Sequence, residues 1–275
     1  MVATEALAIV ALDADDLAGG LALSREAHWN QNDADWRFFL DAGTVFGIRD
    51  PDHRLIATAA LLPYGSGNAW ISMVLVAASW RRRGLATRLV DACLAAAARQ
   101  GLVPWLDATP AGAAVYRPLG FAPTLQLRRL RLEHSRTDVK APPLQASDSA
   151  AFAARDRRAM GFDRSTLLAE ICHRRNSRLC SAGNAIGLVR DGLTSRHIGP
   201  LFADEPDQAL ALVDQIMRSE AGPVLIDVVS TQARFLEGLA ARGWSIERPF
   251  QRMRLGGAGP DIAELPFAVA GPEYG

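Results

Sequence analysis

The chain has 275 residues, of which 49% are hydrophobic and 22% charged, enough for one large or two ordinary globular domains. Its 30 basic and 30 acidic residues cancel, so it lacks the positive charge with which general nucleic-acid binders neutralise many phosphates. The first residues show no charged region followed by an apolar core, and no apolar run reaches the roughly 18 residues of a membrane span. The sequence therefore predicts a cytoplasmic protein that binds neither nucleic acid nor membrane.

Strand and helix signals alternate from the start of the chain to residue 133. Asn32 or Asp33 is a candidate N-cap of one helix, and Gly43 is its stop signal. The turns between the three central strands are rich in the residues that hairpins use. The expected strands are 6–12, 44–50, 54–64, 69–77, 102–109 and 121–133, and the expected helices are 13–27, 32–43, 83–100 and 111–119.

Residues 134–147 are polar, contain a Pro-Pro pair and show no periodicity, which predicts a linker. Beyond it the order of elements repeats in shortened form, and residues 113–123 resemble residues 233–247. We therefore expect an α/β (α+β) protein with a duplicated fold, a diverged second copy and an apolar tail at 258–275. In the second half we expect helices at 148–161, 165–175, 207–219 and 232–243, and strands at 183–192, 194–203, 222–230 and 250–257.

The three cysteines, Cys93, Cys172 and Cys180, have no metal-ligand spacing, so we expect no metal site. Cys93 falls on the apolar face of the helix predicted at 83–100 and is interpreted as a small buried hydrophobic residue. The other two are predicted to be reduced thiols.

The segment SWRRRGLATRLV, residues 79–90, places three arginines and a glycine at the start of an apolar helix. The first turn of a helix has unpaired N–H groups and a partial positive charge, so it can bind an anion. Gly84 has no side chain to keep a phosphate away, and Ala86 obstructs little more. The arginines add positive charge, which favours a ligand with several phosphates.

Two other phosphate-binding patterns do not fit this segment. A P-loop needs glycines at a fixed spacing followed by Lys and Ser/Thr, and the dinucleotide fingerprint needs three glycines. A solvated arginine run at a helix start stays open as an alternative interpretation, although positive charges there are slightly unfavourable.

The segment VAASWRRRGLA resembles motif A of the GNAT (GCN5-related) N-acetyltransferases, with Arg81, Gly84 and Ala86 at the matching positions. About thirty residues later, VYRPLGF resembles the Tyr-x-x-x-Gly-Phe element of the same family, through Tyr116, Gly120 and Phe121. The longer string LDATPAGAAVYRPLGF is similar to a tandem subgroup with a C-terminal YitH/HolE-like domain. The resemblance implies two tandem GNAT-like domains, each a mixed, mostly antiparallel twisted sheet flanked by helices. They would span residues 1–133 and 148–257, with the second degenerate.

The resemblance implies an acetyl-CoA-dependent N-acetyltransferase, in which an amine attacks the bound thioester directly. The backbone amides at the helix start would hold the pyrophosphate, and the edge of the preceding strand would hold the pantetheine arm. Tyr116 would hydrogen-bond or protonate the departing thiolate. The expected cofactor-binding residues are Val74, Leu75, Val76, Arg81, Arg82, Arg83, Gly84, Leu85, Ala86 and Thr87.

A general base is harder to assign. Family members often carry a Glu on the strand before motif A, whereas this chain has Ser72 there. Asp107 on the next strand is the expected substitute, with a structural role as its alternative. Three further candidates come from the first helices: Glu26, His28 and Asp33.

The acceptor is expected to be a small-molecule or peptide amine. Trp29, Asn30, Asp33 and Ser72 are the predicted acceptor-binding residues, whereas Trp36 is interpreted as a core residue.

The second half lacks the Arg-x-x-Gly-x-Gly loop and has acidic Asp204 and Glu205 in its place, so we expect it not to bind CoA. It could close the acceptor pocket or replace the second subunit of a GNAT dimer, which leaves a monomer or a homodimer open. A CoA-binding regulatory module without turnover is the alternative function.

Overall fold

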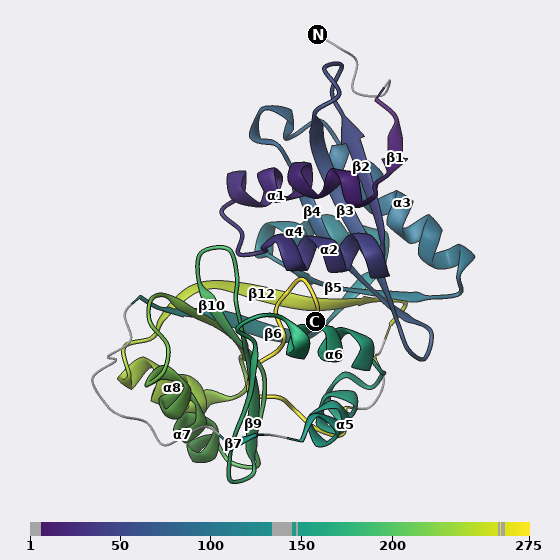
Figure 1. The fold of residues 1–275 in the computed structure, drawn as a ribbon. Coiled ribbons are helices and arrows are strands. Elements are labelled where there is room, and N and C mark those ends of the chain that lie inside the picture. Colours follow the sequence, from purple (N-terminus) through teal and green to yellow (C-terminus); the bar gives the residue numbers. More distant parts are fainter. Residues whose placement is uncertain (1–6, 134–144, 147, 258, 260–261) are drawn as a thin grey trace. The chain divides into compact units, whose positions relative to one another are not determined.

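The computed structural model describes residues 7–133, 145–146, 148–257, 259 and 262–275. The chain divides into two compact units, Met1–Leu106 and Asp107–Gly275. Each unit has a mixed, mostly antiparallel sheet with helices packed on it (Figure 1). The predicted α/β (α+β) class is confirmed.

The sheet of the first unit has the strand order β1-β2-β3-β4-β5, and every neighbouring pair is antiparallel except β4–β5. Helices α1 and α2 cover one face of it and α3 the other (Figure 1). Its strands are β1 (Ile9–Ala11), β2 (Thr44–Arg49), β3 (Leu55–Tyr64), β4 (Asn68–Val76) and β5 (Val103–Ala108), the last two residues of which belong to the second unit. Its helices are α1 (Leu17–Glu26), α2 (Asp33–Ala42) and α3 (Leu85–Arg99), with 3-10 turns at Ala14–Asp16 and Ala78–Trp80.

Helices α1 and α2 pack closely because a tryptophan of one fits a glycine of the other. Trp36 is fully buried, and its indole N–H donates to Ser24 Oγ at 3.0 Å. A Cβ atom at Gly20 would lie 2.5 Å from the Trp36 ring, so only glycine permits this approach. The interpretation of Trp36 as a core residue is confirmed.

The apolar face of α3 is also as predicted. Cys93 lies fully buried on it, and burial raises the pKa of its thiol to about 12. A thiol with so high a pKa is inert at neutral pH, which agrees with a packing role.

The second unit contains the strand order β12-β6-β11-β10-β9-β8-β7, in which β10 and β11 are the parallel pair. Strand β8 was not predicted from the sequence; it forms a hairpin with β9. The strands are β6 (Phe121–Leu132), β7 (Gln145–Ala146), β8 (Arg178–Ala182), β9 (Ala185–Arg190), β10 (Arg196–Phe202), β11 (Val224–Val229) and β12 (Ser245–Leu255). The helices are α4 (Pro110–Tyr116), α5 (Ser149–Met160), α6 (Ser165–His173), α7 (Pro206–Met217) and α8 (Ala233–Ala241), with a 3-10 turn at Arg117–Leu119.

The two units do not coincide with the domains expected at 1–133 and 148–257. Strand β6 belongs to the first of those stretches in sequence, yet it pairs with β11 on one side and with β12 on the other. These pairings place it in the second compact unit. The linker expected at 134–147 lies outside the described residues apart from β7, so the sequence-based boundaries stay a prediction.

The two faces of the second sheet differ in chemistry. Successive strand residues point to opposite faces, and one face joins α7 and α8 in an apolar core that includes Leu130, Val189, Ile198 and Ile226. The preceding or following residue on each of these strands is polar and buried: Arg129, Arg190, His197 and Asp227.

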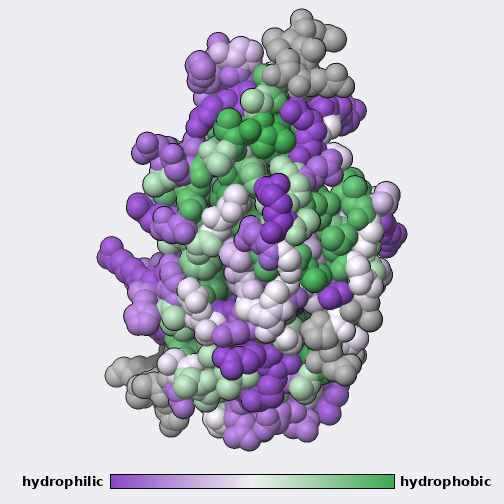
Figure 2. Space-filling view, turned by 90° about the vertical axis from the view of Figure 1, so that its right-hand side faces the viewer, coloured by the Kyte–Doolittle hydropathy of each residue, from purple (hydrophilic) through white to green (hydrophobic). Residues whose placement is uncertain are grey.

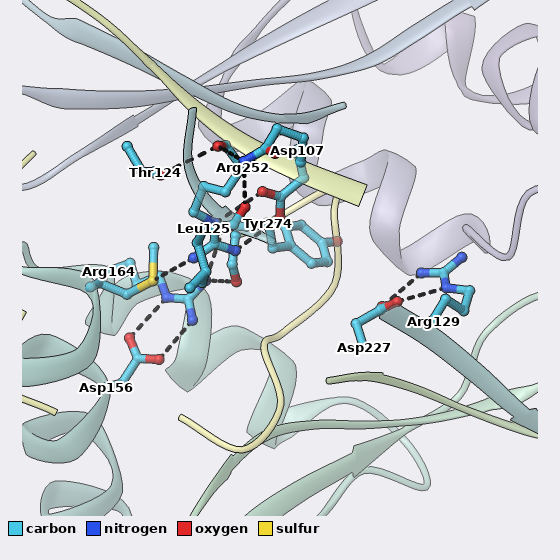
Figure 3. Close-up of polar contacts among 12 residues, drawn as sticks. Asp107, Thr124, Leu125, Arg129, Asp156, Arg164, Asp227, Arg252 and Tyr274 are labelled. Carbon is cyan, nitrogen blue, oxygen red and sulfur yellow. Dashed lines mark hydrogen bonds and ion pairs between the residues drawn. The ribbon is translucent and has the colours of Figure 1, made fainter. Parts of the chain in front are cut away.

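Ion pairs join several of the buried polar side chains of this unit (Figure 3). Arg129 donates to both oxygens of Asp227 at 2.9 and 2.8 Å. Arg164 donates to both oxygens of Asp156 at 2.8 and 2.7 Å. Burial by itself raises the pKa of Asp227, but Arg129 and His197 together hold that pKa well below its ordinary value. Asp227 is therefore ionised, and its charge is compensated within the protein.

Asp107 belongs to the same class of buried pair. Both of its carboxylate oxygens accept hydrogen bonds from Arg252 at 2.9 Å (Figure 3), and its side chain has no exposed surface. Burial raises the pKa of Asp107 against the lowering effect of Arg252. This geometry favours a structural role, with Asp107 fixing the end of β5 to β12.

Apolar side chains reach the surface in separate patches between hydrophilic ones on the face that Figure 2 shows. Large apolar residues that are exposed in the described part of the chain are Val10, Val115, Ile246, Ile262 and Leu265. No described helix combines the length and the apolarity that are needed to cross a membrane.

Asp107→Asn is expected to lower the free energy of unfolding by about 3–5 kcal/mol, because it leaves the buried Arg252 guanidinium uncompensated. The matched control is Asp214→Asn, which removes a bidentate pair to Arg242 with both side chains more than a third exposed. It should cost about 1 kcal/mol or less. Urea unfolding measures both, and equal, small losses would contradict the structural role of Asp107.

Candidate functional site

The turn between β4 and α3 has a backbone conformation that favours glycine at residue 84. Gly84 precedes the first residue of α3 at φ 75°, a left-handed conformation that glycine adopts at no steric cost. Arg82 also has a positive φ, 60°. No side chain caps the helix, so nothing within the turn covers its N-terminal end.

The amides of this turn are the feature that can bind an anion. The first helical hydrogen bond of α3 runs from the Arg88 N–H to the Gly84 carbonyl at 3.1 Å. The backbone N–H groups of residues 82–87 have no acceptor among the described residues. A Cβ atom at Gly84 would meet nothing within 4 Å, so the space beside these amides is open. Unmet N–H groups at the positive end of a 15-residue helix form a site for phosphate oxygens.

The arginines of the turn give it positive charge and also stabilise its conformation. Arg81 Nε donates to the Val76 carbonyl at 3.0 Å, and Arg83 donates to the Ser79 carbonyl at 3.0 Å. The Arg83 guanidinium also lies 4.7 Å from the centre of the Trp80 ring. Two of the three arginines therefore hold the turn in shape.

A carboxylate from α1 fixes the other end of the turn. Glu26 Oε1 accepts a hydrogen bond from the Ala78 N–H at 2.6 Å. This contact gives Glu26, one of the candidate bases, a positioning role that the sequence did not reveal. His28 is exposed at the end of α1, with a φ of 55°.

Strand β4 leaves its parallel neighbour just before the turn. Its pairing with β5 consists of Asn68↔Val103, Ala69↔Pro104 and Trp70↔Trp105. Beyond Trp70 the strand has a bulge at Met73, where φ is 51° and the carbonyl accepts from Thr58 Oγ1 at 2.9 Å. The edge predicted to bind a pantetheine arm, Val74–Val76, thus lies on the separated part of β4.

Ser72 precedes this bulge and is only 8% exposed, and its Oγ has no hydrogen-bond partner in the described part of the chain. Leu62 Cδ2 would lie 2.9 Å from a Cβ atom on Gly43 at the end of α2, so the Leu62 side chain points to the face of the sheet that α2 covers. Trp70 is opposite Leu62 in the strand pair and points to the same face. Because side chains alternate along a strand, Ser72 points to the same face as Trp70. A buried hydroxyl without a partner is costly, so a ligand or water is expected to complete it.

The loop between α1 and α2 supplies the other predicted acceptor residues. Trp29 is half-buried, Asn30 is 8% exposed, and Asp33 is exposed in the first turn of α2. Sequence reasoning missed Gln31, which is 4% exposed and whose Oε1 has no partner within the described residues. No local signal distinguishes Gln31 from its polar neighbours, since only the fold buries it.

Tyr116 lies in the second unit, at the end of α4. Thr109 caps this helix by accepting from the Gly112 N–H at 3.2 Å, and Gly120 ends the following turn at φ 93°. The Tyr116 ring is half-buried and lies 5.9 Å from the centre of the Phe121 ring. The first unit thus holds the turn of residues 82–87 and the predicted acceptor residues, and the second holds Tyr116 and Asp107.

The corresponding turn of the second unit, between β10 and α7, is acidic. Asp204 accepts from Asn184 at 2.7 Å and from Arg155 at 3.2 Å, and Glu205 is the residue before α7. Pro206, the first residue of the helix, has no N–H. This turn therefore offers negative charge and one amide fewer, the opposite of what phosphates need.

Two family models match the chain. The model described as "Acetyltransferase (GNAT) family" matches residues 8–121, and the model described as "Acetyltransferase (GNAT) domain" matches residues 153–264. Among curated proteins, the chain is 23% identical over 248 residues to "Uncharacterized N-acetyltransferase YitH" of Bacillus subtilis (strain 168). That match covers 86% of this chain and 87% of the relative.

Solved structures of similar fold match this chain over most or all of its length. A putative acetyltransferase from Pyrococcus horikoshii has a TM-score of 0.83 at 20% identity, over 100% of this chain and 98% of that one. A tandem GNAT protein from the clavulanic acid biosynthesis pathway has a TM-score of 0.65 at 16% identity, over 93% of this chain and 99% of that one. With a GNAT domain matched in each half and this fold along its whole length, the chain belongs to the tandem GNAT acetyltransferase family.

Proposed function

We propose that this protein is an acetyl-CoA-dependent N-acetyltransferase that transfers an acetyl group to an amine by direct attack in a ternary complex. One observation carries the proposal. The backbone N–H groups of residues 82–87, which have no acceptor among the described residues, follow directly after the part of β4 that has separated from β5. A phosphate site that continues into an open strand edge suits a ligand with a pyrophosphate and a long amide-bearing arm. The family membership supports the same chemistry.

When bound, acetyl-CoA supplies an activated acetyl thioester, whose carbon–sulfur bond breaks as the amine nitrogen bonds to the acetyl carbon. The amides of residues 82–87 would hold the pyrophosphate, and Arg82 would add positive charge at the surface. Val74–Val76 would offer backbone groups to the arm. Tyr116 would give the proton of its phenolic hydroxyl to the leaving thiolate.

The acceptor must lose a proton before it attacks. An alkyl ammonium with a pKa of about 10.4 lies roughly 3 units above neutral pH, which corresponds to about 4–5 kcal/mol. Asp107 is a poor candidate for that proton, because Arg252 occupies both of its oxygens. We propose instead that water held at Ser72 carries the proton away, with Asp33 as the exposed carboxylate on the acceptor side.

A CoA-binding module without turnover is the second candidate, because Ser72 stands where family members often carry a Glu. Such a module would bind CoA at the same site as the enzyme and would differ from it only in that no acetyl group is transferred. A monomer or a homodimer would serve either function.

Gly84→Glu is expected to weaken CoA binding at least tenfold, because a carboxylate would enter the phosphate site. The matched control is Gly101→Glu: Gly101 also has a positive φ, 65°, and open space around it, but follows the other end of α3. Calorimetric titration with CoA measures both variants. Unchanged binding in Gly84→Glu, or equal losses in the two variants, would remove the proposed phosphate site.

Tyr116→Phe is expected to slow thiol release from acetyl-CoA by about a hundredfold, the lower range for loss of a general acid. Its affinity for CoA should stay within about twofold of the parent protein, since the ring and its contact with Phe121 are kept. The assay is free-thiol release with a panel of amines. If CoA binds but no amine supports release by the parent protein, the non-catalytic module is correct.

Ser72→Ala is expected to leave the fold intact, or to stabilise it by about 1 kcal/mol, because it removes a buried hydroxyl without a partner. If Ser72 holds the water that receives the proton, the same variant lowers kcat while the affinity for CoA is kept. Urea unfolding and steady-state kinetics test the two parts. A wild-type kcat in Ser72→Ala would show that the hydroxyl takes no part in the reaction.

A further inference from the structure

Each unit contains a pair of parallel strands whose hydrogen-bonded pairing begins and then ends while the strands continue. In the first unit β4 and β5 pair through Asn68, Ala69 and Trp70. In the second unit β10 and β11 pair through Arg196, His197 and Ile198. Both pairings last three residues, so each sheet has a gap beyond the third residue pair.

In the second unit, a segment of the chain itself lies in this gap. The Leu201 N–H of β10 donates to the Ala268 carbonyl at 2.9 Å, and the Leu201 carbonyl accepts from the Phe267 N–H at 2.9 Å. On the other side, the Val229 N–H of β11 donates to the Phe267 carbonyl at 3.2 Å, and the Val269 N–H donates to the Asp227 carbonyl at 3.0 Å. Residues 267–269 therefore bond to both separated strands, as an added strand does.

The second sheet has a glycine at the point where residues 267–269 approach its backbone most closely. Gly199 is the first residue of β10 beyond the paired part, with φ 151°. A Cβ atom there would lie 2.0 Å from the Val269 carbonyl oxygen, so any other residue would collide with the segment's backbone. Glycine at this position is explained by the close approach of residues 267–269.

The side chains of the segment complete the packing around the gap. Phe267 joins the apolar core under α7 and α8, where its ring lies 5.1 Å from that of Phe235. Val269 packs with Leu127, Val229 and Phe250 in a separate cluster. The segment thus fills the space between the strands with its backbone and the space beside them with its side chains.

Three arginines fix the residues that follow. Arg164 donates to the Tyr274 carbonyl at 2.9 Å and to the Gly275 oxygen at 2.5 Å, while it also pairs with Asp156 (Figure 3). Arg190 donates to the Ala270 carbonyl at 3.2 Å and pairs with Glu273. Arg174 donates to the Tyr274 hydroxyl at 3.3 Å. These contacts hold residues 270–275, the part of the chain that follows the segment.

We propose that residues 267–269 are a built-in substitute for the pantetheine arm in the second domain. They take the strand-edge hydrogen bonds of the second gap, which is permanently closed by the chain itself. The second domain has thereby changed from a cofactor site into a receptor for its own C-terminal segment, and the chain takes up one acyl-CoA, in the first domain. The statement about acyl-CoA rests on the proposed function, whereas closure of the gap does not.

Hydrogen exchange of the intact protein tests the closure. The amides of Leu201, Val229, Phe267 and Val269 are expected to exchange on the order of a thousandfold more slowly than in an unstructured peptide, since they open only with the core. Exchange of the Phe267 and Val269 amides at unstructured rates would overturn the proposal.

Gly199→Val tests whether the segment depends on this close approach. We expect exchange of the Phe267 and Val269 amides to accelerate at least tenfold, while the amides of α3 are unchanged. The matched control is Gly187→Ala on β9, whose Cβ would lie 3.2 Å from the flexible end of the Leu201 side chain, with no atom of residues 267–269 among its three nearest neighbours. Equal protection of the segment in both variants would overturn the proposal; if Gly199→Val does not fold, the intact protein decides.

Addition of CoA to the intact protein separates this proposal from the proposed function. We expect slower exchange at residues 82–87 and no change at Leu201, Val229, Phe267 and Val269. Faster exchange of the segment on CoA addition would show that the second gap opens for the cofactor and would overturn the substitute role. If CoA changes nothing anywhere, the proposed function fails, while protection of the segment still decides whether the gap is closed.

Discussion

The separation of two parallel strands after three residue pairs is the constraint on which the rest of the structure depends. A parallel pair normally continues as far as both strands do, because each unpaired backbone group inside a protein is costly. In the first unit, β4 departs from β5 beyond Trp70 and leads into a helix whose first amides are unmet. The open edge and the open helix end are consecutive in the chain, so one elongated ligand can meet both. The proposed acetyl-CoA site follows from that continuity more than from the arginines.

The second unit has the same separation of two parallel strands, but a segment of the chain itself lies in its gap. Its turn has acidic Asp204 and Glu205 in place of the basic loop, and its gap is filled by residues 267–269. An empty gap in a domain that binds no cofactor would leave the groups of Leu201 unpaired at a cost of about 1–3 kcal/mol each. The segment satisfies them, and the buried arginines that hold its end are themselves compensated by Asp156 and Glu273.

Local sequence patterns predicted many of the helices, strands and turns described above. The features that they did not predict depend on contacts between residues far apart in the chain. The helix that follows Gly84, the strand before it and the acidic turn of the second half are local features, and the structure has them where they were expected. Strand β8 was missed because its residues show no clear alternation. The partner of Asp107 is Arg252, far along the chain, so no spacing rule could reveal that pair. For the same reason Gly199 had no evident purpose until the backbone of Val269 was found against it.

The proposed function requires that the amides of residues 82–87 bind the pyrophosphate of CoA. Backbone amide chemical shifts during a titration with CoA test it most directly, because a hydrogen bond to phosphate moves the resonance of the donating N–H. We expect large shifts at residues 82–87, smaller ones at Val74–Val76 and none at residues 203–205 in the corresponding turn of the second unit. Shifts at residues 203–205, or no shifts at residues 82–87 when CoA is bound, would contradict this binding mode.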